Sequence, residues 1–165
     1  MSEYTITESN MNFIVDTGDT YHIEKSQAYI GICGSIKTVE FIRQKDNNLL
    51  FIEAKTTLTN PDNSANPVEL FNNEISDICE KFIHSLSLLS AVQIGVISET
   101  LPSGWDRAHK ISLKFVLIIR NHQMGWCRSV KHAIGQILPL HISKIWKPEV
   151  LVINQETAQK YNLVK

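Results

Sequence analysis

Residues 39–55 read VEFIRQKDNNLLFIEAK and contain two largely apolar runs separated by a polar turn. The runs predict two β-strands, Thr38–Gln44 and Leu49–Lys55, because Val, Ile and Phe are enriched in strands. Asp and Asn tolerate a positive φ angle, so Asp46 and Asn47 predict a two-residue hairpin turn. That turn fixes which residues lie opposite one another, namely Lys45 and Asn48, Gln44 and Leu49, Ile42 and Phe51, and Glu40 and Glu53.

The two glutamates of this hairpin are expected to lie side by side. Glu40 and Glu53 share a face as opposite residues, with Cβ atoms roughly 4.5–5.5 Å apart. Lys55 follows Glu53 by two residues and therefore points to the same face. The other face carries Arg43 and is otherwise apolar, which predicts that it is buried through Val39, Phe41, Leu50, Ile52 and Ala54.

Two carboxylates facing each other across a ladder destabilise it unless a positive charge compensates them. Lys55 supplies one such charge, and a divalent cation supplies more. Carboxylate oxygens are hard ligands that suit Mg²⁺ or Mn²⁺ better than zinc. A lysine beside the metal orients or activates a water, which is what metal-assisted phosphodiester hydrolysis requires. The alternative is a solvated cluster of two acids and a base on an exposed strand face, and a turn one residue longer would separate the glutamates.

The same stretch resembles the core of the PD-(D/E)XK nuclease superfamily, whose members include many restriction endonucleases. In that family an acid opens the second core strand and a (D/E)-X-K triplet ends the third. Glu53-Ala54-Lys55 matches the triplet, and Glu40 falls where the first acid belongs. The usual Pro-Asp is replaced by Val39-Glu40, and Glu24 is the nearest candidate for the acid that many members take from the first helix.

The resemblance implies an α/β fold with a central mixed β-sheet flanked by helices and a restriction-endonuclease-like αβββαβ core. It implies Glu40, Glu53 and Lys55 as catalytic residues and Glu40, Glu53 and Glu24 as ligands of Mg²⁺ or Mn²⁺. The chain is expected to form one nuclease-like domain over 1–165, with the core at about 10–120 and a helix-strand-helix extension at about 121–165.

The remaining elements follow from periodicity and capping signals. A helix is predicted from Pro67 to about Ala91, with Asn66 as its N-cap and Glu69 as its capping-box acid. On this helix, Lys81 is expected on the polar side with Glu74 and Asp77. The other predictions are a short helix or irregular arm over the first twenty residues, strands at Tyr21–Cys33, Val92–Ile97, Ile111–Arg120 and Val150–Ile153, a helix at Trp126–Leu138, and a helix or turn at Gln155–Tyr161.

The composition is that of an ordinary globular protein, with 165 residues, 43% hydrophobic and 20% charged. No apolar run is long enough to span a membrane, no secretory signal is recognised, and three widely spaced cysteines predict a reducing cytoplasm. The histidines lack zinc-ligand spacing.

Charge is divided unevenly along the chain. Residues 1–105 contain six Lys and Arg against fourteen Asp and Glu, whereas residues 106–148 contain eight against one. The basic 106–148 segment indicates either an anionic partner or a face that packs against the acidic part.

These patterns predict a metal-dependent nuclease that acts on nucleic acid, with DNA favoured over RNA and with a homodimer as one form of assembly. The alternative is a module without catalytic activity that keeps this fold for binding or assembly.

Overall fold

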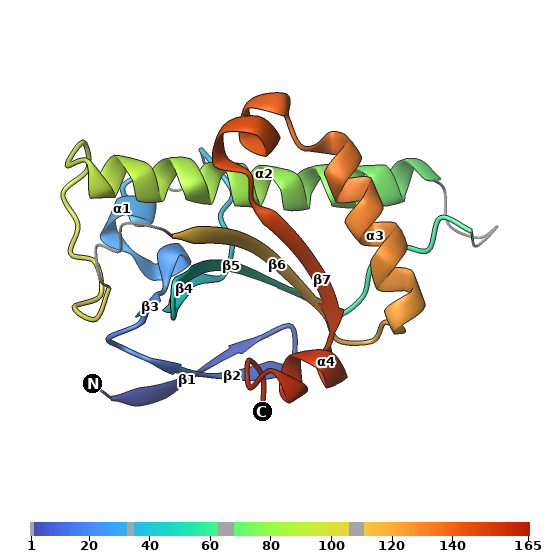
Figure 1. Cartoon of the computed structure of the whole chain (residues 1–165), viewed down its shortest axis with the longest axis horizontal. Coiled ribbons are helices and arrows are strands. Elements are labelled where there is room, and N and C mark those ends of the chain that lie inside the picture. The colour runs from blue at the N-terminus through green and yellow to red at the C-terminus, as the bar shows by residue number, and fades with distance from the viewer. Residues whose placement is uncertain (1, 33–34, 63–67, 106–110) are drawn as a thin grey trace.

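The computed structural model describes residues 2–32, 35–62, 68–105 and 111–165 (Figure 1). Its centre is a mixed sheet of five strands in the order β3-β4-β5-β6-β7, beside a separate antiparallel pair, β1 and β2. The strands are β1 Glu3–Glu8, β2 Met11–Asp16, β3 Thr20–Tyr21, β4 Phe41–Lys45, β5 Asn48–Lys55, β6 Ser112–Ile119 and β7 Glu149–Asn154. The helical elements are η1 Ile23–Lys25, α1 Gln27–Ile30, α2 Val68–Gln93, α3 Met124–Ile137, η2 Ile142–Trp146 and α4 Gln155–Lys160. The predicted class, an α/β fold with a mixed sheet flanked by helices, is confirmed.

The hairpin of β4 and β5 has the predicted register. Gln44 lies opposite Leu49 and Ile42 opposite Phe51, and Asp46 has the positive φ, 53°, that the turn needs. Regular pairing begins at Phe41, and the Glu40 N–H donates to Ile52 O at 3.1 Å rather than continuing the ladder to Glu53. The prediction that Glu40 and Glu53 form a regular ladder pair is therefore wrong. Glu40 lies at an irregularity just before β4, and irregularities of this kind change the direction in which a side chain points.

The sheet is covered on both faces, as Figure 1 shows. On one face α2 packs on β5 and β6, with Phe82 stacked on Phe115 at 4.6 Å between ring centroids, and α3 packs on β7 and α2. On the other face the β1–β2 hairpin covers the side of β4 and β5 that holds Phe41 and Ile52, and α4 covers β6 and β7. Burial of this second face was predicted, but the glutamate side of the hairpin is also covered, by α2. Residues of β5 are therefore buried from either side.

The long helix α2 matches its prediction closely, since its buried residues Phe71, Ile75 and Phe82 recur at helical spacing. The predicted N-cap Asn66 and the first predicted helical residue, Pro67, lie outside the described residues. Strand β6, predicted as the sheet's buried middle, has β5 and β7 as parallel neighbours. In the parts of the chain that the structure describes, no helix combines the length and apolarity needed to span a membrane.

Three further predictions of secondary structure are wrong. The first twenty residues form the β1–β2 hairpin, because Met11, Phe13 and Val15 alternate inward on β2. The strand predicted at Tyr21–Cys33 is only two residues long, since the Ser26 side chain accepts a hydrogen bond from Tyr29 N and starts α1. No strand forms over 92–97, where α2 ends in a turn.

Candidate functional site

The two glutamates of the hairpin lie beneath α2 at the carboxyl end of β5. Glu53 is 0% exposed and Glu40 is 7% exposed. Helix α2 fixes the chain beside Glu40, because the Val39 N–H donates to Ser85 Oγ at 2.9 Å. The alternative of a solvated cluster on an exposed strand face is therefore wrong, and both carboxyl groups are held away from bulk water.

Lys81 of α2 is the residue that compensates this buried negative charge. Its Nζ lies 2.8 Å from Glu53 Oε1 and 3.9 Å from Glu40 Oε1, and its side chain is 17% exposed. Lys55 Nζ lies 3.4 Å from the same Glu53 oxygen and is 35% exposed. The prediction that Lys81 lies on the polar side of the helix is wrong. Its place three residues after Ile78 and four before Ser85 puts it at the border of the buried face, which is the signal that the sequence contained.

Glu24 joins the cluster, although not from the strand start where it was expected. It lies in η1, in the segment that links β3 to β4. One carboxylate oxygen each from Glu24, Glu40 and Glu8 lie within 4.8 Å of one another. Sequence reasoning missed Glu8, because its approach depends on how the β1–β2 hairpin packs against the sheet.

The electrostatics of the cluster follow from burial and like charge. Burial, the negative charge of Glu53 and Glu24, and a hydrogen bond with Glu24 raise the pKa of Glu40 to about 9, although Lys81 opposes the shift. Burial also raises the pKa of Glu53, against the effect of Lys81 and Lys55. Burial lowers the pKa of Lys81, but the neighbouring carboxylates outweigh it, so that the net shift is upward.

The donor set fits a hard divalent cation. Glu24, Glu40 and Glu53 offer only oxygen atoms, which Mg²⁺ and Mn²⁺ prefer. Glu53 Oε2 is buried and has no hydrogen-bond partner among the residues that the structure describes. A buried carboxylate oxygen without a partner is costly, so this oxygen is a candidate ligand atom for a cation.

The basic side chains of the 106–148 segment lie in different places in the fold. Lys114 lies on β6 and pairs with Glu149 at 2.9 Å, on the face away from α2. Arg120 is exposed at the end of β6, and its N–H donates to Lys55 O at 2.9 Å. Lys110 lies outside the described residues.

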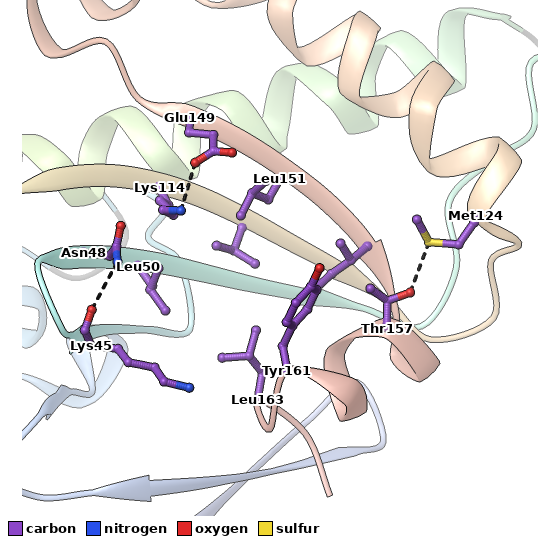
Figure 2. Close-up of a pocket in the computed structure, with 12 residues that line it drawn as sticks. Lys45, Asn48, Leu50, Lys114, Met124, Glu149, Leu151, Thr157, Tyr161 and Leu163 are labelled. Atoms are coloured by element: carbon purple, nitrogen blue, oxygen red, sulfur yellow. Dashed lines mark hydrogen bonds and ion pairs between the residues drawn. The ribbon is translucent and has the colours of Figure 1, made fainter.

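A separate cavity of about 440 Å³ lies on the other face of the sheet, beside α4 (Figure 2). Aliphatic side chains such as Leu50, Leu151 and Leu163 line it, and Lys114 and Glu149 form their ion pair at its rim. The convergent acids and bases lie at the acidic cluster instead, so we take that cluster as the candidate functional site.

Comparison of the chain with protein-family models, with curated proteins and with solved structures gives no match. The fold and the site therefore define the class by themselves: an α/β protein with a carboxylate–lysine cluster at the end of the β4–β5 hairpin.

Proposed function

We propose that this protein is a metal-dependent nuclease that hydrolyses phosphodiester bonds. The observation that carries the proposal is the convergence of Glu24, Glu40 and Glu53 with two lysines, Lys55 and Lys81, beside a buried carboxylate oxygen without a partner. Acids and bases whose pKa values are shifted by burial and by one another are typical of catalytic sites.

The order of elements supports the resemblance to the PD-(D/E)XK superfamily. Three antiparallel neighbours in the sheet, β3, β4 and β5, with η1 and α1 inserted between β3 and β4, are followed by the helix α2 and a parallel strand, β6. Glu40 precedes the second of these strands, and Glu53 and Lys55 end the third. Glu24 comes from the short helical turn η1, which follows β3, whereas the resemblance implies an acid from a helix that precedes the three strands.

Each residue has a distinct role in the proposed reaction. A bound Mg²⁺ or Mn²⁺ supplies Lewis acidity toward a phosphodiester oxygen. Glu24, Glu40 and Glu53 would hold the cation, and Glu40 would have to be deprotonated to act as a ligand. Lys81 lowers the pKa of Glu53 against the larger effect of burial and holds its carboxylate by a hydrogen bond, so it is a positioning residue. Lys55, the more exposed lysine, orients the attacking water or neutralises the charge that develops on the phosphate.

The nucleic acid is proposed to approach at the carboxyl ends of β5 and β6, with DNA favoured over RNA. Arg120 is placed there through its main-chain hydrogen bond to Lys55. Arg128 and Lys131 of α3 are exposed and available to phosphates. A cytoplasmic setting belongs to the same proposal, because Cys79 and Cys127 are free buried thiols.

A second function is favoured by one specific observation. Glu53 is fully buried and bonded to Lys81, so the cluster also fits a buried ion-pair network that fastens α2 to β5. In that case the chain is a binding or assembly module without catalytic activity. The two functions differ in whether the cluster takes up a divalent cation.

A cleavage assay tests the proposal. Wild-type protein is incubated with supercoiled plasmid and with end-labelled single- and double-stranded oligonucleotides, in Mg²⁺, in Mn²⁺ or in EDTA. Cleavage is expected only with metal, and Glu53→Gln and Lys55→Met are each expected to lower its rate by about 100-fold or more. Glu69→Gln, on the exposed first turn of α2, is the matched control.

The outcomes separate the two functions. Metal-dependent cleavage that is lost in Glu53→Gln and kept in Glu69→Gln supports the nuclease. Cleavage by Glu53→Gln at the wild-type rate contradicts the assigned roles. Absence of cleavage on every substrate in both metals favours the assembly module.

A further inference from the structure

The β1–β2 hairpin turns beside the candidate site. Its strands pair with Glu8 opposite Met11, so Ser9 and Asn10 form a two-residue turn. Both turn residues have positive φ angles, 49° and 58°, as a type I′ hairpin turn requires. The turn is thus a defined structure, and Glu8 is the last strand residue before it.

Two hydrogen bonds fasten this turn to the strand that carries the Glu-X-Lys triplet. Ser9 Oγ donates to Ala54 O at 2.9 Å, and Ala54 stands between Glu53 and Lys55. Thr56 Oγ1 donates to Ser9 O at 3.3 Å, one residue beyond Lys55. The turn is therefore attached to β5 at the candidate site itself.

The body of the hairpin is anchored by apolar packing on the same strands. Phe13 is fully buried, and its ring meets Phe41 edge-on with 5.2 Å between centroids. Ile6, Met11 and Val15 join the same core. Since both the packing and the two hydrogen bonds hold the hairpin, Glu8 reaches the cluster from a fixed scaffold.

Glu8 lies there with cations nearby, Lys25 and Lys81, but not in ion-pair contact with either. Its carboxylate is within 4.8 Å of those of Glu24 and Glu40. In the part of the chain that the structure describes, no Lys, Arg or His nitrogen forms an ion pair with Glu8 or Glu24. Burial and the neighbouring Glu24 raise the pKa of Glu8, against the opposing charges of Lys25 and Lys81. The carboxylates of Glu8, Glu24 and Glu40 therefore lie close together, and among the described residues only that of Glu40 forms an ion pair, with Lys81.

A second and independent observation points to a ligand. Glu53 Oε2 is fully buried and unpartnered among the described residues, although Oε1 of the same carboxylate is bonded to Lys81. We propose that Glu8 is a further carboxylate ligand of the divalent cation, supplied by the β1–β2 hairpin, so that Glu8 joins Glu24, Glu40 and Glu53 around the ion. This inference rests on the metal site of the proposed function and adds a residue from outside the elements that the resemblance covers.

The chemistry selects a hard, oxygen-preferring cation. An all-carboxylate set with water as the remaining ligand suits Mg²⁺ or Mn²⁺ and is a poor site for zinc. The hairpin therefore takes part in cation affinity, and its attachment through Ser9 is a positioning device.

Mn²⁺ binding tests the inference without reference to catalysis. Purified wild-type protein, freed of metal with EDTA and dialysed, is titrated with Mn²⁺, and the free ion is followed by electron paramagnetic resonance. Wild-type protein is expected to bind Mn²⁺, and Glu8→Gln to bind it about tenfold or more weakly, as expected when a ligand or its close support is lost. Glu3→Gln, at an exposed position of the same strand, is the matched control and is expected to bind like wild type.

Two further variants keep the inference testable if Glu8→Gln folds poorly. Glu8→Asp keeps the charge but shortens the reach, and Ser9→Ala removes the hydrogen bond to Ala54 O. Both are expected to weaken Mn²⁺ binding less than Glu8→Gln, with thermal unfolding in EDTA close to wild type.

Unchanged Mn²⁺ affinity in Glu8→Gln overturns the inference, and so does a wild-type protein that binds no Mn²⁺ at millimolar concentration. If Mn²⁺ binds in a Glu8-dependent manner but no nucleic acid is cleaved, the inference stands and the nuclease proposal fails. Cleavage that is equal in wild type and Glu8→Gln, with equal Mn²⁺ affinity, leaves the nuclease proposal standing and removes Glu8 from the site.

Discussion

Replacing Glu40 by Gln is expected to remove a pH dependence from the stability of the metal-free protein. The Glu40 carboxyl releases its proton near pH 4.5 in the unfolded chain, whereas burial and the neighbouring Glu53 and Glu24 raise its pKa to about 9 in the folded protein. Between these pH values the folded state binds one proton more than the unfolded state. Stability from this group is thus present at low pH and is lost as the pH rises toward 9.

The magnitude follows from the size of the pKa difference. Each pH unit in this window lowers the free energy of unfolding by about 1.4 kcal/mol for one proton. From pH 6.5 to 8.5 the wild-type protein is expected to lose about 3 kcal/mol through Glu40, a large part of the roughly 5–15 kcal/mol that stabilises a domain. The Gln amide donates to Glu24 as the protonated carboxyl does, so Glu40→Gln is expected to match wild type near pH 6.5 and to exceed it at pH 8.5.

Urea denaturation in EDTA measures the effect, followed by tryptophan fluorescence at pH 6.5, 7.5 and 8.5. Trp105 packs against the core and donates to Asp19 O at 2.8 Å, so it reports unfolding. Glu69→Gln serves as the control, with the wild-type pH slope. Parallel stability curves for wild type and Glu40→Gln over this range would refute the assignment of the extra proton to Glu40.

Three further predictions concern the surroundings of the cluster. Lys81→Met leaves Glu53 buried without its cation and is expected to lower the free energy of unfolding by about 3–5 kcal/mol. The double change Lys81→Met and Glu53→Gln is expected to cost clearly less than the sum of the two single changes, and an additive double-mutant cycle from urea denaturation would contradict this coupling. Ser85→Ala leaves the buried Val39 N–H without an acceptor and is expected to lower the free energy of unfolding by about 1–3 kcal/mol. The same change at the exposed Ser87 is expected to cost less, and equal effects of the two changes would show that the hydrogen bond of Val39 contributes little. Arg120→Gln is expected to weaken DNA binding regardless of sequence and to reduce the slope of log affinity against log salt concentration by about 1, as measured by fluorescence anisotropy. The control Lys160→Gln, on α4, is expected to bind DNA like wild type, and an unaltered slope in Arg120→Gln would place the nucleic acid elsewhere.

The local and periodic features of this chain were determined by its sequence alone. The hairpin register followed from the two-residue turn at Asp46 and Asn47, and α2 and β6 followed from their apolar patterns, because turn chemistry and periodicity are local properties. The N-terminal hairpin was missed, since its short strands gain stability only by packing on the sheet.

The composition of the candidate site was decided by the tertiary structure. Glu40, Glu53 and Lys55 could be placed together from the hairpin, but Lys81 reaches them only because α2 crosses β5, and Glu8 only because the β1–β2 hairpin is fastened at Ala54. These contacts join residues far apart in the sequence. Helical spacing places Lys81 at the border of the buried face of α2, but it does not identify the residues that Lys81 contacts. The burial that shifts the carboxyl pKa values likewise exists only once α2 covers the glutamate side of the sheet.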